Sequence, residues 1–171
     1  RAALGFDEDA FRGSISAGLL QGEIGYSVLE RKWARPTLDV NGLWGGFQGA
    51  GEKTIIPAHA HAKVSMRLVA NQEPEALFQR FSAYVERVCP PGVTASVQLL
   101  GTGRPVRTPL DHPATRAAAQ ALEATFGTAP VFIGAGGSIP VAEMFERQLG
   151  LTVVLMGFAN PDDNAHAPNE S

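Results

Sequence analysis

Cysteine, long hydrophobic runs and an excess of basic residues are all lacking in this sequence of 171 residues. Its single cysteine, Cys89, excludes a disulfide within the chain and fits a reducing compartment such as the cytoplasm. No apolar run approaches the roughly 20 residues that span a bilayer, so no membrane association is expected. The formal net charge is −3, and without a basic patch no nucleic-acid partner is expected. A composition with 44% hydrophobic and 18% charged residues suits a soluble globular protein of one ordinary or two small domains.

Two segments of the first half are predicted to form β-strands joined by a glycine-rich loop. Residues 37–42 have strand composition, and residues 54–69 alternate apolar and polar side chains, which gives a strand with one apolar and one polar face. A strand, not a helix, is expected after Lys53-Thr54, so the pattern does not match a phosphate-binding loop. The loop is interpreted as a flexible hairpin connection with glycine at 42, 45, 46, 49 and 51.

The polar face of the second strand carries His59, His61 and Arg67. Residues i and i+2 of a strand share a face, so His59-x-His61 could chelate a metal, although no cysteine or acid nearby in sequence completes the ligand set. A solvated sheet face is the plain alternative. In a third interpretation this face lines a substrate site, with Arg67 as a clamp for a carboxylate.

Helical periodicity alternates with further short apolar segments along the rest of the chain. Helices are expected at about 6–11, 26–34, 74–88 (capped by Asn71), 113–126 (capped by Asp111) and 139–149. Strands are expected at 93–100, 130–133 and 151–156, the last of them buried. The first half thus predicts an α+β sandwich, an antiparallel sheet with helices on one face, and the second half predicts part of a parallel α/β sheet.

Two polar segments of the second half are candidates for chemistry. Gly136-Gly137-Ser138 precedes a predicted helix, where free N–H groups bind anions, although Ser138 could equally be a simple cap. Residues 157–170 form a polar loop that contains His166 among carboxylates. Neutral imidazole is the commonest metal ligand, but one ligand does not make a metal site.

Three stretches together resemble the zinc-dependent amidohydrolases that include carnosine-type dipeptidases, aminoacylase, glutamate carboxypeptidase and succinyl-diaminopimelate desuccinylase. They are residues 36–57, which begin PTLDVNG and end KTIIP, residues 65–69 (SMRLV), and GGSIP at 136–140 with DDNAHAPNE at 162–170. The chain is most similar to the dipeptidase branch. The resemblance implies that residues 1–102 are the later part of a lid, or dimerisation, domain, and that residues 103–171 are the C-terminal part of the catalytic domain.

The resemblance also implies roles for individual residues. Two metal ions, usually zinc, activate a water for attack on the amide of a dipeptide or N-acyl amino acid. His166 matches a metal ligand, and Ser138, Arg67 and Thr54 match substrate-binding positions, with Arg67 on the substrate carboxylate. In dimeric members the lid contacts can come from the neighbouring subunit, so a homodimer is expected.

The remaining metal ligands of the family, its glutamate base and its lid histidine have no match in this sequence. A catalytic zinc needs about three protein ligands, and His166 alone cannot hold one. We therefore expect no catalytic residue, weak or no zinc binding and no activity in this chain alone, which resembles a fragment of the enzyme. The alternative function is a dimerisation or interaction module without chemistry of its own.

Overall fold

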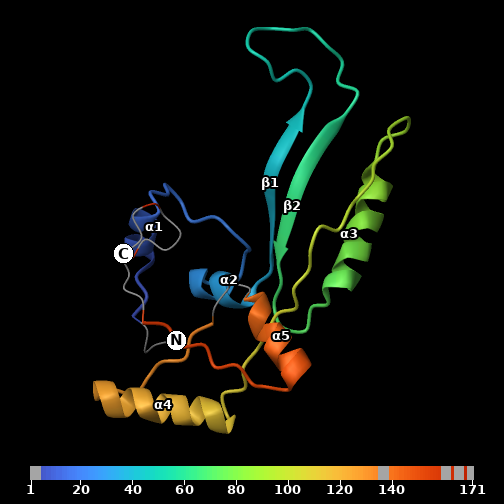
Figure 1. Ribbon diagram of the computed structural model, residues 1–171. Coiled ribbons are helices and arrows are strands. Elements are labelled where there is room, and N and C mark those ends of the chain that lie inside the picture. The colour runs from blue at the N-terminus through green and yellow to red at the C-terminus, as the bar shows by residue number, and fades with distance from the viewer. Residues whose placement is uncertain (1–4, 135–138, 159–162, 164–167, 169–171) are drawn as a thin grey trace. The chain divides into compact units, whose positions relative to one another are not determined.

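The structure is a computed structural model that describes residues 5–134, 139–158, 163 and 168. Its elements in chain order are α1 (Glu8–Ser14), α2 (Val28–Ala34), β1 (Thr37–Gly45), β2 (Ala60–Arg67), α3 (Pro74–Val88), α4 (Pro113–Phe126) and α5 (Pro140–Leu149) (Figure 1). The predicted α/β class is confirmed. The chain divides into two compact units, residues 1–107 with 131–144, and residues 108–130 with 145–171. The division into domains at about residue 102 concerns the whole protein and stays a prediction.

The first unit contains an antiparallel hairpin of β1 and β2, as the alternating sequence predicts. Thr37 lies opposite Arg67 at one end, and Gly45 lies opposite Ala60 at the other, with a register irregularity between Val40 and Gly42. The second strand is shorter than predicted, because residues 54–59 and 68–69 lie outside it. They include a proline at 57, which has no N–H to donate to a ladder. The connection between the two strands (Figure 1) contains the predicted glycines at 46, 49 and 51, whereas Gly42 and Gly45 lie within β1, which is longer than predicted.

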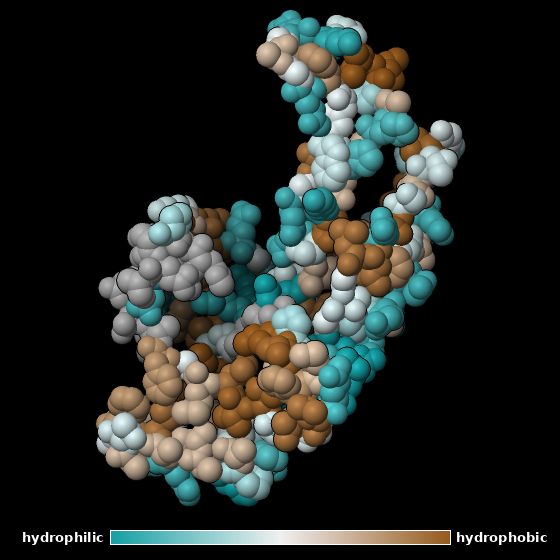
Figure 2. All heavy atoms as spheres, viewed as in Figure 1, coloured by the Kyte–Doolittle hydropathy of each residue, from teal (hydrophilic) through white to brown (hydrophobic). Residues whose placement is uncertain are grey.

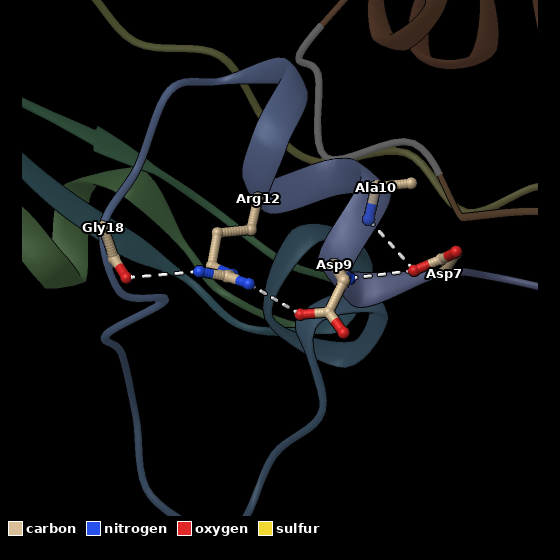
Figure 3. Close-up of polar contacts among 5 residues, drawn as sticks. All are labelled: Asp7, Asp9, Ala10, Arg12 and Gly18. Carbon is tan, nitrogen blue, oxygen red and sulfur yellow. Dashed lines mark hydrogen bonds and ion pairs between the residues drawn. The ribbon is translucent and has the colours of Figure 1, made fainter.

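Local capping accounts for the first two helices. The Asp7 carboxylate accepts hydrogen bonds from the backbone N–H groups of Asp9 and Ala10 at 2.9 and 3.0 Å, and thereby starts α1 (Figure 3). Ser27 starts α2 with a capping box: its hydroxyl accepts from the Glu30 N–H, and the Glu30 carboxylate accepts from the Ser27 N–H. These side chains satisfy backbone donors that have no partner inside the helix.

The caps predicted for two later helices are wrong. Asn71 has a left-handed backbone (φ 68°) in the turn before α3, and the residue at the cap position is Glu73, without a side-chain cap bond. At α4 the cap is His112, whose Nδ1 accepts from the Ala114 N–H at 3.2 Å, and not Asp111. In both helices proline occupies the first position, and proline fixes the start because it needs no hydrogen-bond acceptor.

The prediction of strands at 93–100, 130–133 and 151–156 is wrong, because the described residues of these segments form no β-ladder with another segment. A strand requires a neighbour to accept and donate its backbone bonds, and β1 and β2 pair only with each other among the described residues. The segment predicted to be a buried strand is instead partly exposed: Leu151 and Leu155 are 53% and 55% accessible. Its one described side-chain anchor is Thr108, whose hydroxyl donates to the Val153 carbonyl at 2.6 Å.

Few side chains of the described residues are buried. Val28, Ala142 and Thr115 are 8%, 2% and 3% accessible, whereas the hairpin leaves its apolar face in solvent, with Leu38 and Leu43 at 54% and 78%. Figure 2 shows many hydrophobic side chains at the surface. In the described part of the chain, the β1–β2 pairing is the only extensive contact between two elements. No helix in this part is long and apolar enough to cross a membrane.

Candidate functional site

Arg67, the candidate carboxylate clamp, is the last residue of β2 and lines an open hollow of the first unit with a volume of about 730 Å³. The hollow is formed mainly by α1, α2 and the adjoining ends of the two strands. Its lining is Phe11, Ile15, Leu20, Gln21, Val28, Arg31, Lys32, Trp33, Arg35, Thr37, Arg67 and Gly134. The combination of apolar side chains with four cations, and with no carboxylate among the described lining residues, suits an anionic ligand with an apolar part.

Glu23, just outside this lining, holds two of the four cations, one through its carboxylate and one through its backbone carbonyl. Arg35 donates to Glu23 through Nε and a terminal nitrogen, both at 2.6 Å, and Arg31 Nε donates to the Glu23 backbone carbonyl at 3.0 Å. The hydrogen bonds from Arg35 hold the pKa of the Glu23 carboxyl below its usual range. Lys32 lies 4.9 Å from the centre of the Phe11 ring. Neighbouring groups thus hold the cations on and beside α2, and Arg67 lines the same hollow from the end of β2.

Thr54, the second predicted substrate-binding residue, lies in the connection between β1 and β2 and is exposed. This connection joins the strands at the end of the hairpin opposite to Arg67 (Figure 1). An eight-residue strand spans about 23 Å, so the length of β2 separates Arg67 from the loop that carries Thr54. Within one chain the structure does not bring these two residues together.

Ser138 and His166, the other two predicted site residues, lie outside the described residues, and their roles stay predictions. Among the described residues no three His, Cys, Asp or Glu side chains gather where they could hold a metal ion. The described part of this chain therefore does not fit a catalytic metal centre by itself, because such a centre needs about three protein ligands.

A tryptophan that the sequence did not indicate lies beside the histidine pair on the polar face of the sheet. The rings of His59 and His61 lie 6.4 Å apart, and the Trp44 ring stacks on His61 at 5.1 Å with an interplanar angle of 13°. Trp44 lies directly opposite His61 in the ladder. A 14-residue connection and a register irregularity separate the two strands, so this partner could not be identified from alternation alone.

Residues 4–93 match the family described as the peptidase dimerisation domain, which is a domain of M20 peptidases. This match covers more than half of the chain, so the chain belongs to that family. The resemblance to this metallopeptidase family, which rests on residues 36–57, 65–69 and 136–140 with 162–170, is thereby confirmed, and zinc as the metal stays a prediction.

Curated relatives are metallodipeptidases and dipeptidases. The chain is 36% identical over 148 residues to the Cys-Gly metallodipeptidase DUG1 of Candida albicans, which covers 84% of this chain and 30% of that protein. It is 28% identical over 171 residues to the Beta-Ala-His dipeptidase of Homo sapiens, covering 98% of this chain and 34% of the relative. The chain spans about a third of the length of these relatives.

Solved structures of the same family share the fold. The M20 family metallo-carboxypeptidase Sso-CP2 from Sulfolobus solfataricus superposes with a TM-score of 0.82 at 28% identity, over 99% of this chain and 38% of that one. The di-peptidase Dug1p from Saccharomyces cerevisiae superposes with a TM-score of 0.76 at 26% identity, over 98% of this chain and 36% of that one.

Proposed function

We propose that the whole protein to which this chain belongs is a metal-dependent peptidase that cleaves the amide bond of a dipeptide or N-acyl amino acid. The chain supplies the lid surface that holds the substrate carboxylate. Arg67 carries this proposal, because it is a guanidinium at the end of a strand, facing a hollow with apolar walls and other cations. A guanidinium binds a carboxylate with two parallel hydrogen bonds, which a terminal peptide carboxylate can accept.

The metal of this peptidase, zinc by resemblance, depends on residues beyond the described part of the chain. His166 would be one ligand, and Ser138 would hold a polar group of the substrate. We propose that the chain alone is inactive and binds zinc weakly at His166, because one imidazole leaves at least two coordination positions without protein ligands. Peptidase activity of the isolated chain, or tight stoichiometric zinc binding that His166→Ala abolishes, would contradict this.

We further propose that the protein is a homodimer and that Arg67 and Thr54 serve different active sites. The two residues lie at opposite ends of the hairpin, and the length of β2 is larger than a dipeptide. One substrate therefore cannot touch both residues of the same chain. In a twofold symmetric dimer each site would take Arg67 from one protomer and Thr54 from its partner.

The carboxylate clamp is tested with the full-length protein and two substrates, a dipeptide and the same dipeptide with its C-terminal carboxylate amidated. Arg67→Ala should lower kcat/KM for the free acid by about tenfold to a hundredfold, roughly 1.5–3 kcal/mol for a charge-assisted bond. The amidated substrate should lose much less, because it has no carboxylate to bind. Arg67→Lys should be intermediate, since lysine keeps the charge but not the planar fork.

Arg80→Ala is the matched control, because Arg80 is an exposed arginine on α3 outside the hollow. It should leave kcat/KM unchanged for both substrates. An equal loss for both substrates in Arg67→Ala would show that Arg67 acts through the fold and not on the carboxylate.

The second candidate, a dimerisation module without its own chemistry, is favoured by the exposed apolar face of the hairpin. Leu38, Val40 and Leu43 are 54%, 60% and 78% accessible, and such contiguous apolar positions are typical of surfaces that another chain covers. Sedimentation of the full-length protein and of a Leu43→Lys variant tests the dimer that both candidates require, and Leu43→Lys should weaken it. A monomer at every concentration would contradict both this candidate and the shared active site.

A further inference from the structure

We propose that His59 and His61, with Trp44 beside them, form a surface site for a divalent transition-metal ion. Cu²⁺ is the ion that should bind most tightly, because imidazole suits copper and Cu²⁺ has the highest affinity of the divalent first-row series. The remaining coordination positions would hold water.

The geometry brings the two imidazoles within reach of one ion. Both side chains are exposed, and their ring centres lie 6.4 Å apart at an angle of 38°. Two imidazoles that bind one ion at about 2.1 Å per metal–nitrogen bond have ring centres about 4.6 Å apart when the bonds meet near the 90° angle of tetragonal Cu²⁺ coordination. His59 precedes the first residue of β2, outside the ladder, so a side-chain rotation can close this difference.

Trp44 positions one of the two ligands. It lies opposite His61 in the ladder, and the two rings are nearly parallel, 13° apart, with centres at 5.1 Å. A stacked ring has less rotational freedom to lose when it binds an ion. The backbones of Gly45 and His59 approach each other closely, because a Cβ on Gly45 would lie only 3.0 Å from the His59 carbonyl oxygen. The backbone that carries both histidines is therefore held against β1.

The residues around the histidine pair supply no further protein ligand to the site. Lys63 follows His61 on this face, and its positive charge opposes cation binding. No third His, Cys, Asp or Glu joins the pair within the described residues. We therefore expect reversible binding that responds strongly to the loss of either imidazole, and not the closed four-ligand arrangement of a structural zinc site.

The test is a Cu²⁺ titration of the full-length protein whose catalytic sites are already loaded with zinc. Cu²⁺ bound at this pair lies beside the Trp44 ring, so it should quench tryptophan fluorescence in a saturable way, and Trp44→Phe should remove this part of the signal. His59→Asn and His61→Asn should each weaken the affinity more than about tenfold, since loss of a ligand exceeds the 10–100-fold effect of losing a supporting partner. Pulsed electron paramagnetic resonance should count two coordinated imidazoles in the wild type and one in each variant.

His112→Asn is the matched control, because it removes a histidine at the cap of α4 while asparagine remains a good cap. It should leave both the quenching and the imidazole count unchanged. Lys63→Gln should tighten binding modestly by removing the opposing charge. Quenching that persists in both histidine variants, no saturable quenching by Cu²⁺, or a single coordinated imidazole in the wild type would overturn the proposal.

Discussion

Glu23 and Arg35 are joined by two hydrogen bonds of 2.6 Å, one from Nε and one from a terminal guanidinium nitrogen. This bidentate pair connects the segment before α2 to the end of that helix, beside the hollow that Arg67 enters. Because the charged carboxylate is the form that accepts both bonds, the pKa of Glu23 is lowered, with the hydrogen bonds from Arg35 as the main cause.

The pair predicts a small pH-dependent contribution to stability. A lowered pKa means that the stabilisation is present above the ordinary carboxyl pKa of about 4.3 and is lost as the pH falls through the folded-state value. Glu23→Gln should lower the melting temperature slightly at pH 7, and the difference from the wild type should shrink below about pH 4. Glu86→Gln, at an exposed position of α3, is the control. Thermal unfolding at several pH values checks this, and a difference independent of pH would contradict it.

Gly45 at the end of β1 is predicted to be intolerant of a side chain. A Cβ there would meet the His59 carbonyl oxygen at 3.0 Å and the Ala60 Cα at 3.2 Å, and both belong to backbone that cannot rotate away. Gly45→Ala should therefore destabilise this end of the hairpin by about 1 kcal/mol or more. Hydrogen exchange of the β2 amides measures the effect. Gly101→Ala is the control, because a Cβ at Gly101 would meet no atom within 4 Å. Unchanged protection in Gly45→Ala would contradict the ladder geometry.

The capping box of α2 predicts a local effect of Ser27. Its hydroxyl accepts from the Glu30 N–H, and its own N–H donates to the Glu30 carboxylate at 2.8 Å. Ser27→Ala should destabilise the helix by about 0.5–2 kcal/mol, whereas Ser27→Thr should retain most of the cap. Amide exchange within α2 separates the two variants, and equal exchange rates in both would show that the box contributes little.

The helices could be predicted from the sequence because their signals are local. Proline at the first position fixes the starts of α3, α4 and α5, and glycine with a left-handed backbone follows α4 and α5 at Gly127 and Gly150. Alternation likewise predicted the two faces of β2. Each of these features depends on residues that are close together in the sequence.

The extra strands and the complete site could not be predicted because they depend on partners distant in sequence. Alternation at 93–100 indicates two faces but supplies no neighbouring strand. The stack of Trp44 on His61 depends on a ladder register with an irregularity between Val40 and Gly42. The roles of Ser138 and His166 came only from the resemblance, and their positions lie outside the described residues.

The central claim, a peptidase site shared between two protomers, can be tested with a heterodimer of two impaired variants. Full-length Arg67→Ala and Thr54→Val are coexpressed with different affinity tags, and the mixed dimer is isolated through both tags. Each variant homodimer should have low kcat/KM for a dipeptide, because every site then lacks one substrate contact. The Arg67→Ala/Thr54→Val double variant, paired with wild type, is the control.

If each site combines Arg67 of one protomer with Thr54 of the other, the mixed dimer has one intact site and should show about half of the wild-type activity. The control dimer of wild type with the double variant then has no intact site and should be nearly inactive. The contradicting result is the reverse, a mixed dimer no more active than the variant homodimers and a control dimer with about half of the wild-type activity, which is expected if both residues of a site come from one chain.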